Sequence, residues 1–365
     1  MHKFVSLYTG AGGLDLGFIA AGFEPVFAND INADALDTYR AAMEMIAARD
    51  GGQAPHDVVT GDIRQVRRLP ERGCADLVIG GPPCQGFSVA GKMDPNDPRS
   101  RHVFDFLGMV ERVQPRAFIM ENVKALARNR RWAGTIADIR NKAEEIGYKT
   151  YLDVLNSADY GVPQTRERMF LVGFRDQDVE FEYPKPTVAE HVGVAAVLKS
   201  LPPIGQPGND QTCKAIITTA KEPVLRPSPF AGMLFNGQGR PMDVNRPAPT
   251  LPASMGGNRT PIVDQETLEN GSPQWVVGYH DSLMAGGVVA KSVPSRLRRI
   301  SVQEAAAIQS FPSDMPWQGS QSSRYRQIGN AVPPKLAYAV AVSVAKALGF
   351  KPSSNQAILK KLSSQ

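Results

Sequence analysis

Hydrophobic positions in the first half of the chain form short apolar or β-branched runs separated by helical patterns. The runs have the length of strands and lie at residues 4–8, 25–29, 76–79, 116–121, 149–155 and 168–174. Helices are predicted between several of these runs, at residues 33–48, 102–113 and 133–146. Strands that alternate with helices favour an α/β fold, with a mostly parallel sheet covered by helices on both faces.

The pattern changes between residues 175 and 295. Prolines and glycines are frequent there, and no long amphipathic helix is predicted. Helical periodicity returns at residues 302–309 and 335–348. We therefore expect the chain to leave the α/β domain, form a smaller irregular domain of strands and loops, and come back. The predicted divisions are an α/β domain at 1–178, the smaller domain at 179–297, the return at 298–350 and a flexible tail at 351–365.

Composition places the chain among ordinary globular proteins, with 42% hydrophobic and 21% charged residues. Three cysteines in 365 residues imply no disulfide framework and favour a reducing compartment. No signal peptide and no membrane-spanning run are recognised, so we expect a cytoplasmic protein without a membrane partner. The net charge of +5 allows a polyanionic partner but does not require one.

A proline-stiffened turn carries the most reactive side chain. Gly-Gly-Pro-Pro-Cys-Gln at residues 80–85 directly follows the apolar run 76–79. Cys84 is therefore expected at the carboxyl end of a buried strand, where open α/β sheets bind their ligands. A thiol held there suits a nucleophile. The alternative is a small buried hydrophobe, which we expect for Cys74 and Cys213. The polar segment 86–101 predicts a lid.

A glycine-rich turn follows the first strand, at residues 8–14. Glycines allow a sharp turn and a close approach of ligand to backbone. Asp30 lies 20 residues after Gly10, a spacing that suits a carboxylate on ribose hydroxyls. Asp62, at the end of a third strand, is placed to accept from an adenine amino group. The turn alone leaves NAD, nucleotide and S-adenosyl-L-methionine (AdoMet) sites open, and each Asp has a helix cap as its alternative.

Two further motifs place charge near the same edge of the sheet. Glu121 ends the run 116–121, and a carboxyl in a partly closed pocket acquires a raised pKa suited to acid or hydrogen-bonding roles. Gln-Thr-Arg-Glu-Arg at 164–168 puts Arg166 and Arg168 two residues apart, on one face of a strand. One guanidinium suits a carbonyl oxygen or phosphate and the other a carboxylate, whereas the alternative is a surface ion-pair ladder.

The order of these motifs resembles that of the DNA (cytosine-5) methyltransferases of bacterial restriction-modification type. Pro-Pro-Cys-Gln, Glu-Asn-Val and Gln-x-Arg-x-Arg lie between the glycine turn and Gln-Ile-Gly-Asn-Ala-Val-Pro at 327–333. The likeness covers nearly the whole chain outside 175–295. It implies the Rossmann-like fold of AdoMet-dependent methyltransferases, with a target-recognition domain at 179–297. Residues 298–304 and 309–312 match the segment that organises this domain against the catalytic one.

The resemblance also implies roles for individual residues. Cys84 would add to C6 of a cytosine flipped out of double-stranded DNA, and Glu121 would hold N3 and the exocyclic amine. Arg168 would bind O2 and Arg166 would support the site, without a metal. The methyl group would pass from AdoMet to C5 and leave S-adenosyl-L-homocysteine. The expected cofactor contacts are Tyr8, Gly10, Ala11, Gly12, Gly13, Leu14, Asp30, Ile31, Asp62, Ile63, Pro83, Asn330 and Ala331.

Expected DNA contacts divide into two groups. Gln85 and Ser88 follow from the resemblance, whereas Asn258, Arg259, Arg240 and Arg246 are candidates because polar residues on glycine-rich loops can read base edges or bind phosphates. Each of the latter four has a loop-stabilising alternative. The chain departs from the family pattern with Ser6 for Asp, Tyr8 for Phe, Asp30 for Glu and His102 for Leu.

Three alternatives to a DNA methyltransferase remain. They are an RNA (tRNA) cytosine-5 methyltransferase, a catalytically silent DNA-binding relative, and a nucleotide-binding dehydrogenase. The Cys-Phe-Thr of the RNA subgroup is not found, the four catalytic candidates are all kept, and a dehydrogenase leaves the cysteine turn unexplained. The expected setting is a bacterial or phage modification enzyme, with or without a cognate restriction endonuclease that acts independently.

Overall fold

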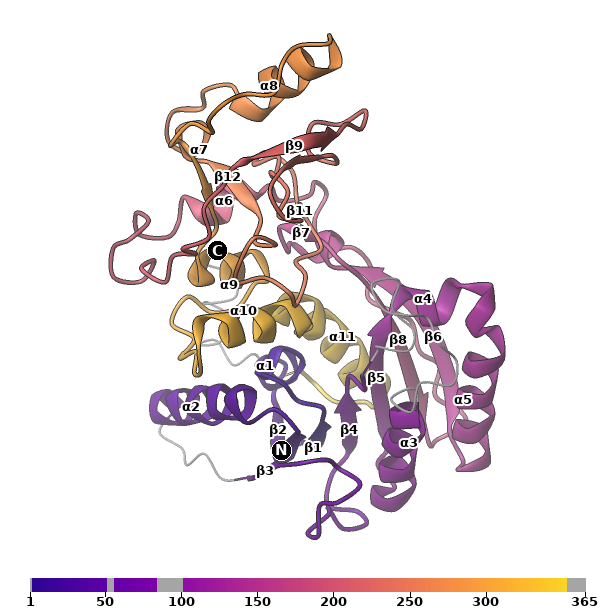
Figure 1. Cartoon of the computed structure of the whole chain (residues 1–365). Helices are drawn as coiled ribbons and strands as arrows, with labels where there is room; N and C mark the ends of the chain where they lie inside the picture. The colour runs from indigo at the N-terminus through magenta and orange to yellow at the C-terminus, as the bar shows by residue number, and fades with distance from the viewer. Residues whose placement is uncertain (1, 51–55, 84–100, 353–365) are drawn as a thin grey trace.

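A seven-stranded sheet forms the centre of the molecule (Figure 1). The computed structural model describes residues 2–50, 56–83 and 101–352, and it does not describe the side chains of residues 49 and 50. The strand order is β3-β2-β1-β4-β5-β8-β6. The strands are β1 (His2–Leu7), β2 (Phe23–Asp30), β3 (Asp57–Thr60), β4 (Leu77–Gly80), β5 (Ala117–Val123), β6 (Lys149–Asn156) and β8 (Glu167–Phe174). The α/β fold class predicted from the sequence is confirmed.

The strand order reverses at β1. This strand pairs in parallel with β2 on one side and with β4 on the other, and β5 continues the parallel set beyond β4. Only β8 runs antiparallel to its neighbours β5 and β6. Where the order reverses, the helices leave on opposite faces and a crevice opens at the carboxyl ends of the strands. Leu7 and Gly80 are paired, so the turns after β1 and β4 begin side by side at that crevice.

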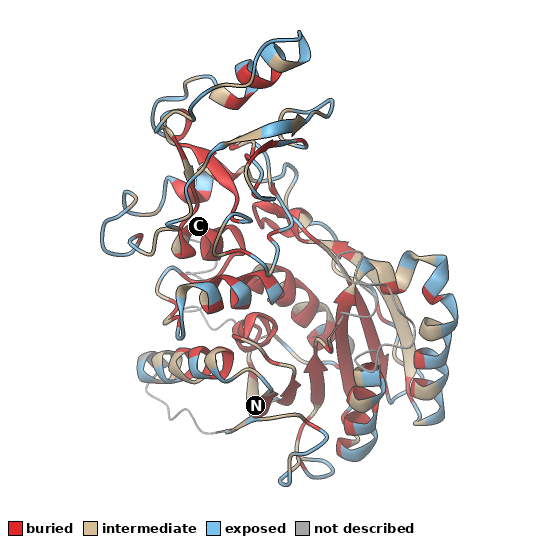
Figure 2. Ribbon diagram, viewed as in Figure 1, coloured by how far each residue is buried: buried red, intermediate tan, exposed pale blue. Residues whose placement is uncertain are grey.

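Helices cover both faces of the sheet. One face packs against α1 (Gly13–Ala20), α2 (Ala33–Asp50) and α11 (Pro334–Ala347). The other packs against α3 (His102–Val113), α4 (Lys124–Arg128) and α5 (Ala133–Glu145). Side chains alternate between the faces along a strand, so Phe4 joins the first core and Val5 the second. Figure 2 shows the resulting layers, with buried strands between helices whose outer sides are exposed.

The remaining elements are short. Between the sheet and the carboxyl-terminal helices lie α6 (Val194–Leu198), β9 (Thr219–Val224), β10 (Met233–Phe235), β11 (Ala248–Pro249), β12 (Ile262–Asp264), α7 (Gln265–Asn270), α8 (Trp275–Met284) and β13 (Leu297–Arg299). The others are η2 (Arg130–Trp132), η3 (Ser157–Tyr160), β7 (Gln164–Thr165), α9 (Val302–Ile308) and α10 (Gln321–Asn330). Leu234, Phe235, Ile262, Val276, Tyr279 and Leu297 form a separate small core. Two helices of ten residues, α8 and α10, were not predicted. Among the described helices, none has both the length and the apolar character needed to cross a membrane.

Candidate active site

A buried ion pair lies at the carboxyl end of the sheet. Glu121, near the end of β5, pairs with Arg168 on the neighbouring β8 through Oε1 and Nε at 2.9 Å. Both side chains are largely shielded, with 11% and 14% of their surfaces exposed. Glu121 and Arg168 come together because β5 and β8 are paired. Val123, two residues after Glu121, is opposite Arg168, so Glu121 and Arg168 lie at the same end of adjacent strands. The carboxylate and guanidinium are thus held together at the edge where a substrate would enter.

The turn after β4 packs directly against this pair. A Cβ added at Gly81 would lie 2.8 Å from Glu121 Oε2, so only glycine allows the turn to come this close. Asn122 Nδ2 donates to the carbonyl oxygen of Pro82 at 3.1 Å and ties the same turn to β5. Cys84, Gln85 and Ser88 lie outside the described residues. Pro83, the last described residue before Cys84, is half-buried at this edge.

Burial and charge act in opposite directions on Glu121. Burial raises the pKa of this carboxyl above its usual value, and the charges of Arg168 and Arg166 only partly offset that rise. A carboxyl with a raised pKa takes up a proton more readily than usual; as the acid it can donate a hydrogen bond, and as the carboxylate it can only accept one. The pair therefore offers one group that can exchange a proton and one that stays cationic.

Arg166 is a buried connection between three segments. It lies between β7 and β8 and is 1% exposed. Its two terminal nitrogens donate to the carbonyl oxygens of Leu251, at 3.3 Å, and of Gly329, at 2.8 Å. Gln164 also accepts a hydrogen bond from the backbone N–H of Leu251. The sequence predicted that one of the two arginines would bind a carbonyl oxygen. It did not indicate that Arg166 would bind backbone carbonyl oxygens of the protein itself.

The glycine turn adopts the left-handed conformations that its sequence suggests. Gly10 and Gly12 have φ angles of 57° and 84°, a region that glycine enters without steric cost. Asp30 holds the turn, because its Oδ2 accepts from the Gly10 N–H at 2.8 Å while Oδ1 accepts from Asn32 N–H. Burial raises the pKa of Asp30, and these backbone hydrogen bonds lower it. Its neighbour Ile31 is 71% exposed, an unusual position for a large apolar side chain.

The turn packs against the carboxyl-terminal segment. A Cβ at Gly13 would lie 2.3 Å from the carbonyl oxygen of Val332 and 3.1 Å from the Cβ of Ala331. Ala11 to Leu14 are buried, Gly10 is half-buried, and Asn330 is exposed at the end of α10. The fold therefore brings Asn330 and Ala331 next to the glycine turn, although more than 300 residues separate them in the chain.

Asp62 already has a partner. Arg64 donates to its carboxylate from Nη2 at 2.5 Å, from Nε at 2.9 Å and from its backbone N–H at 3.0 Å. These contacts lower the pKa of Asp62 to about 2. Ile63 is buried in the core of the second face. The sequence did not predict the contact between Arg64 and Asp62, because an Asp-x-Arg segment looks the same whether its arginine binds the aspartate or is solvated.

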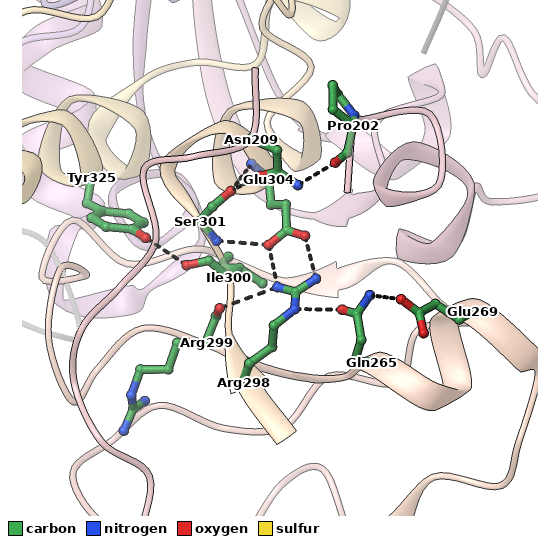
Figure 3. Close-up of polar contacts among 10 residues, drawn as sticks. All are labelled: Pro202, Asn209, Gln265, Glu269, Arg298, Arg299, Ile300, Ser301, Glu304 and Tyr325. Atoms are coloured by element: carbon green, nitrogen blue, oxygen red, sulfur yellow. Dashed lines mark hydrogen bonds and ion pairs between the residues drawn. The ribbon is translucent and has the colours of Figure 1, made fainter. Parts of the chain in front are cut away.

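The segment 298–304 joins the small core to α9 through a dense polar cluster (Figure 3). Arg298 donates both terminal nitrogens to the buried Glu304, each at 2.7 Å, and its Nε to Gln265 on α7 at 2.6 Å. Ser301 caps α9 in a capping box with Glu304 and donates to Asn209 at 2.5 Å. The cluster fixes α7 and the 202–209 loop relative to α9.

The four candidate DNA contacts of the 179–297 segment are all exposed on loops. They are Arg240, Arg246, Asn258 and Arg259. Arg246 has 82% of its side chain exposed and lies 3.7 Å from Asp243, too far for a strong ion pair. Within residues 2–50, 56–83 and 101–352 there is no group of three acidic, histidine or cysteine side chains suited to a metal ion.

Comparisons with known proteins identify the family of the chain. A family model of C-5 cytosine-specific DNA methylases matches residues 2–346. Type II methyltransferase M1.HphI of Haemophilus parahaemolyticus is 32% identical over 351 residues, covering 94% of this chain and 86% of that protein. Type II methyltransferase M.FnuDI of Fusobacterium nucleatum is 32% identical over 370 residues, covering 98% of each.

Solved structures support the fold. The S. pombe Dnmt2 methyltransferase has a TM-score of 0.64 at 16% identity, covering 96% of this chain and 100% of that one. The EhMeth methyltransferase of Entamoeba histolytica has a TM-score of 0.62 at 15% identity, covering 95% and 99%. With a family match that spans nearly the whole sequence, this chain belongs to the C-5 cytosine-specific DNA methylases and is a DNA (cytosine-5) methyltransferase of restriction-modification type.

Proposed function

We propose that this enzyme methylates C5 of a cytosine flipped out of a short specific sequence in double-stranded DNA, with AdoMet as methyl donor and through a covalent adduct between Cys84 and C6. The observation that carries the proposal is the Glu121–Arg168 pair packed against the turn that leads into Cys84. A proton-exchanging carboxyl, a fixed cation and a thiol would then converge on one base. A stacked base cannot reach such a recessed site, so it must leave the duplex.

The residues of the glycine turn fit AdoMet. Gly10 has open space where a Cβ would stand, so a ligand can approach its backbone. The Asp30 carboxylate keeps lone pairs for ribose hydroxyls, and the exposed Ile31 offers an apolar surface for an adenine ring. Tyr8, Gly10 to Leu14, Asp62, Ile63, Pro83, Asn330 and Ala331 complete the proposed pocket. AdoMet supplies the transferable methyl group.

The chain's own residues account for the activation of the base. The Cys84 thiolate forms a bond to C6, and the electron pair of the C5–C6 double bond moves to C5 and toward N3. Glu121 donates to N3 as the neutral acid, which its raised pKa favours, and accepts from the exocyclic amine as it loses that proton. Arg168 stabilises O2. After methylation, the C5 proton passes to water, its electron pair re-forms the C5–C6 double bond, and the C6–S bond breaks to release the thiolate. The N3 proton returns to Glu121, which restores the ring. Arg166 supports the site from behind.

Target recognition is assigned to residues 179–297. Part of this segment has a small core of its own, another part joins the first core of the sheet, and its loops expose Arg240, Arg246, Asn258 and Arg259. Arg side chains bind phosphates and set register, whereas base edges give sequence specificity. The Arg298 cluster would hold this recognition domain at a fixed angle to the catalytic domain at 1–178 and 298–350. Gln85 and Ser88 would approach the DNA from the catalytic side. The named relatives suggest a bacterial modification role, with or without a cognate endonuclease.

The test combines purified protein, methyl-labelled AdoMet and unmethylated genomic DNA, with tRNA in parallel. Cys84→Ser is the test variant. Cys74→Ser is the matched control, because Cys74 is a half-buried thiol that precedes the amino end of β4, whereas Cys84 follows the carboxyl end. We expect 5-methylcytosine at one short DNA motif, lost in Cys84→Ser and kept in Cys74→Ser. DNA containing 5-fluorocytosine should trap the adduct, because fluorine cannot leave C5 as a proton does. Label confined to tRNA supports the RNA alternative, and AdoMet binding without label supports a silent DNA-binding relative.

A further inference from the structure

Tyr8 adopts a strained backbone conformation at the crevice. Its φ of 55° lies in the left-handed region, which only two other non-glycine residues of the described chain enter, Gln114 and Ser310. Gln114 and Ser310 follow helices, where such a conformation is common. Tyr8 instead follows β1, at the point where the strand order reverses. A side chain of this size normally avoids the region at a cost of about 1–2 kcal/mol, so contacts elsewhere must hold it there.

The Tyr8 side chain is held from helix α3. Its hydroxyl lies 3.2 Å from His102 Nδ1 and donates to the His102 carbonyl oxygen at 3.3 Å. The two rings meet edge to face, with centroids 5.5 Å apart. His102 is the first residue of α3, on the opposite side of the sheet from the helix that follows the glycine turn. Tyr8 and His102 each stand where the family pattern has an apolar residue, Phe and Leu respectively. These two more polar residues are therefore in contact with each other.

Asp105 orients the imidazole. Its Oδ2 is buried, forms no hydrogen bond of good geometry among the described residues, and lies 3.3 Å from His102 Nδ1. A carboxylate oxygen only accepts, so this arrangement favours a proton on Nδ1. With a proton on Nδ1, this N–H can also reach the Tyr8 hydroxyl oxygen, while the Tyr8 hydroxyl donates its own proton to the His102 carbonyl oxygen. The Tyr8 hydroxyl is therefore held by both the side chain and the backbone of His102.

The ring lies among the groups assigned to the cofactor. Asp62, Arg64 and Asp30, which end or follow β3 and β2, all act on Tyr8 electrostatically. Burial, and then the charge of Asp105, raises the pKa of Tyr8 far above its usual value, so the hydroxyl remains a donor throughout the physiological range. Tyr8 is only half-buried, so part of its surface stays accessible.

We propose that His102 is a positioning residue for the AdoMet pocket, acting through the hydrogen bonds that hold the Tyr8 ring in its strained place. The inference rests on the proposed function, because it assumes that AdoMet lies against Tyr8. Loss of one hydrogen bond of about 1–1.5 kcal/mol corresponds to about a tenfold change in affinity. Tyr8→Phe removes both hydrogen bonds, whereas His102→Leu removes only the one to Nδ1, so the loss in His102→Leu is contained in the loss in Tyr8→Phe and the two are not additive.

The experiment is a double-mutant cycle in the full-length protein. AdoMet dissociation constants come from calorimetry, and AdoMet KM, kcat and DNA affinity from methylation and binding assays. The variants are Tyr8→Phe, His102→Leu and the two combined, with His102→Asn as conservative rescue because the Asn amide can place a donor near the position of Nδ1. Tyr151→Phe is the control. It removes a hydroxyl that donates to the Val179 carbonyl oxygen at 2.8 Å, on β6 far from the crevice.

We expect AdoMet affinity to fall about tenfold in each single variant, with no further loss in the double variant. Recovery is expected in His102→Asn, the rise in AdoMet KM should exceed any fall in kcat, and DNA affinity should stay within about twofold. Unchanged AdoMet affinity in His102→Leu, or fully additive losses, would overturn the positioning role while the wild type still binds AdoMet. Wild-type protein that binds no AdoMet would overturn the proposed cofactor and this role together. A similar loss in Tyr151→Phe would show general destabilisation and also contradict the role.

Discussion

Asp15 is a buried carboxyl on the first turn of α1, next to the glycine turn. Its Oδ1 accepts a hydrogen bond from Ser6 at 2.9 Å, and Ser6 accepts one from Thr9 at the same distance. Burial raises the pKa of Asp15 to about 7, and the hydroxyl groups of Ser6 and Tyr39 oppose that rise only in part. We predict that Asp15→Asn stabilises the protein at alkaline pH, because the amide keeps the oxygen acceptor and never ionises.

The sign follows from proton binding in the two states. The ordinary pKa of this carboxyl is 3.8, so between that value and about 7 the folded chain holds a proton that the unfolded chain has released. The resulting stability is present at low pH and is lost as pH rises through the folded pKa. A shift of about three units corresponds to about 4 kcal/mol in full. Between about pH 5 and pH 8, the part lost by the wild type is roughly 2–3 kcal/mol.

The assay is urea denaturation of the wild type and Asp15→Asn at about pH 5 and pH 8. Subtracting the free energy of unfolding of the wild type from that of the variant at each pH removes the contribution of groups that titrate alike in both proteins. The free energy of unfolding of the variant, relative to wild type, should increase by about 2–3 kcal/mol between the two pH values. Asp138→Asn, on the exposed side of α5, is the matched control and should show no such change. An Asp15→Asn difference that is equal at both pH values would refute the reasoning.

Three further predictions address packing, the polar cluster and the proposed role of the Glu121 carboxyl. Gly17→Ala would place a Cβ 2.4 Å from the Cβ of Ala337 where α1 crosses α11, and thermal unfolding should show a loss of about 1–3 kcal/mol. Arg298→Met would leave the buried Glu304 charge without its cation, and denaturation should show a loss of about 3–5 kcal/mol. Glu121→Gln keeps the shape of the side chain but cannot exchange a proton, so kcat should fall at least about a hundredfold in the methylation assay while AdoMet affinity is kept.

The sequence was most informative where burial imposes a pattern. The central strand β4 is a continuous apolar run because both of its faces are covered. Helix α3 begins and ends at the predicted residues because its apolar positions repeat with helical period. Helix α10 was missed because its sequence is mostly polar. Only Tyr325 and Ile328 give it large apolar anchors, and Tyr325 is further held by donating to the Ile300 carbonyl oxygen at 2.6 Å. Such a helix depends on its tertiary contacts more than on its own pattern.

The hydrophobic pattern of the sequence could not predict which segments come into contact with each other. The sequence predicted Glu121 and the cysteine turn at the same edge of the sheet, but the contact of Gly81 with the Glu121 carboxylate depends on β4 and β5 being neighbours in register. The Asp62–Arg64 pair was not predicted either, since charged residues two apart in a loop are more often solvated.

Arg166 joins segments that lie far apart in the chain. Its two terminal nitrogens reach carbonyl oxygens 85 and 163 residues away in the chain, one leading into the loop of Asn258 and Arg259 and the other at the end of α10 beside Asn330. A lysine has a single nitrogen and cannot hold two separate backbone positions in a fixed geometry. One buried guanidinium therefore connects the start of β8, the proposed recognition loop and the proposed cofactor pocket.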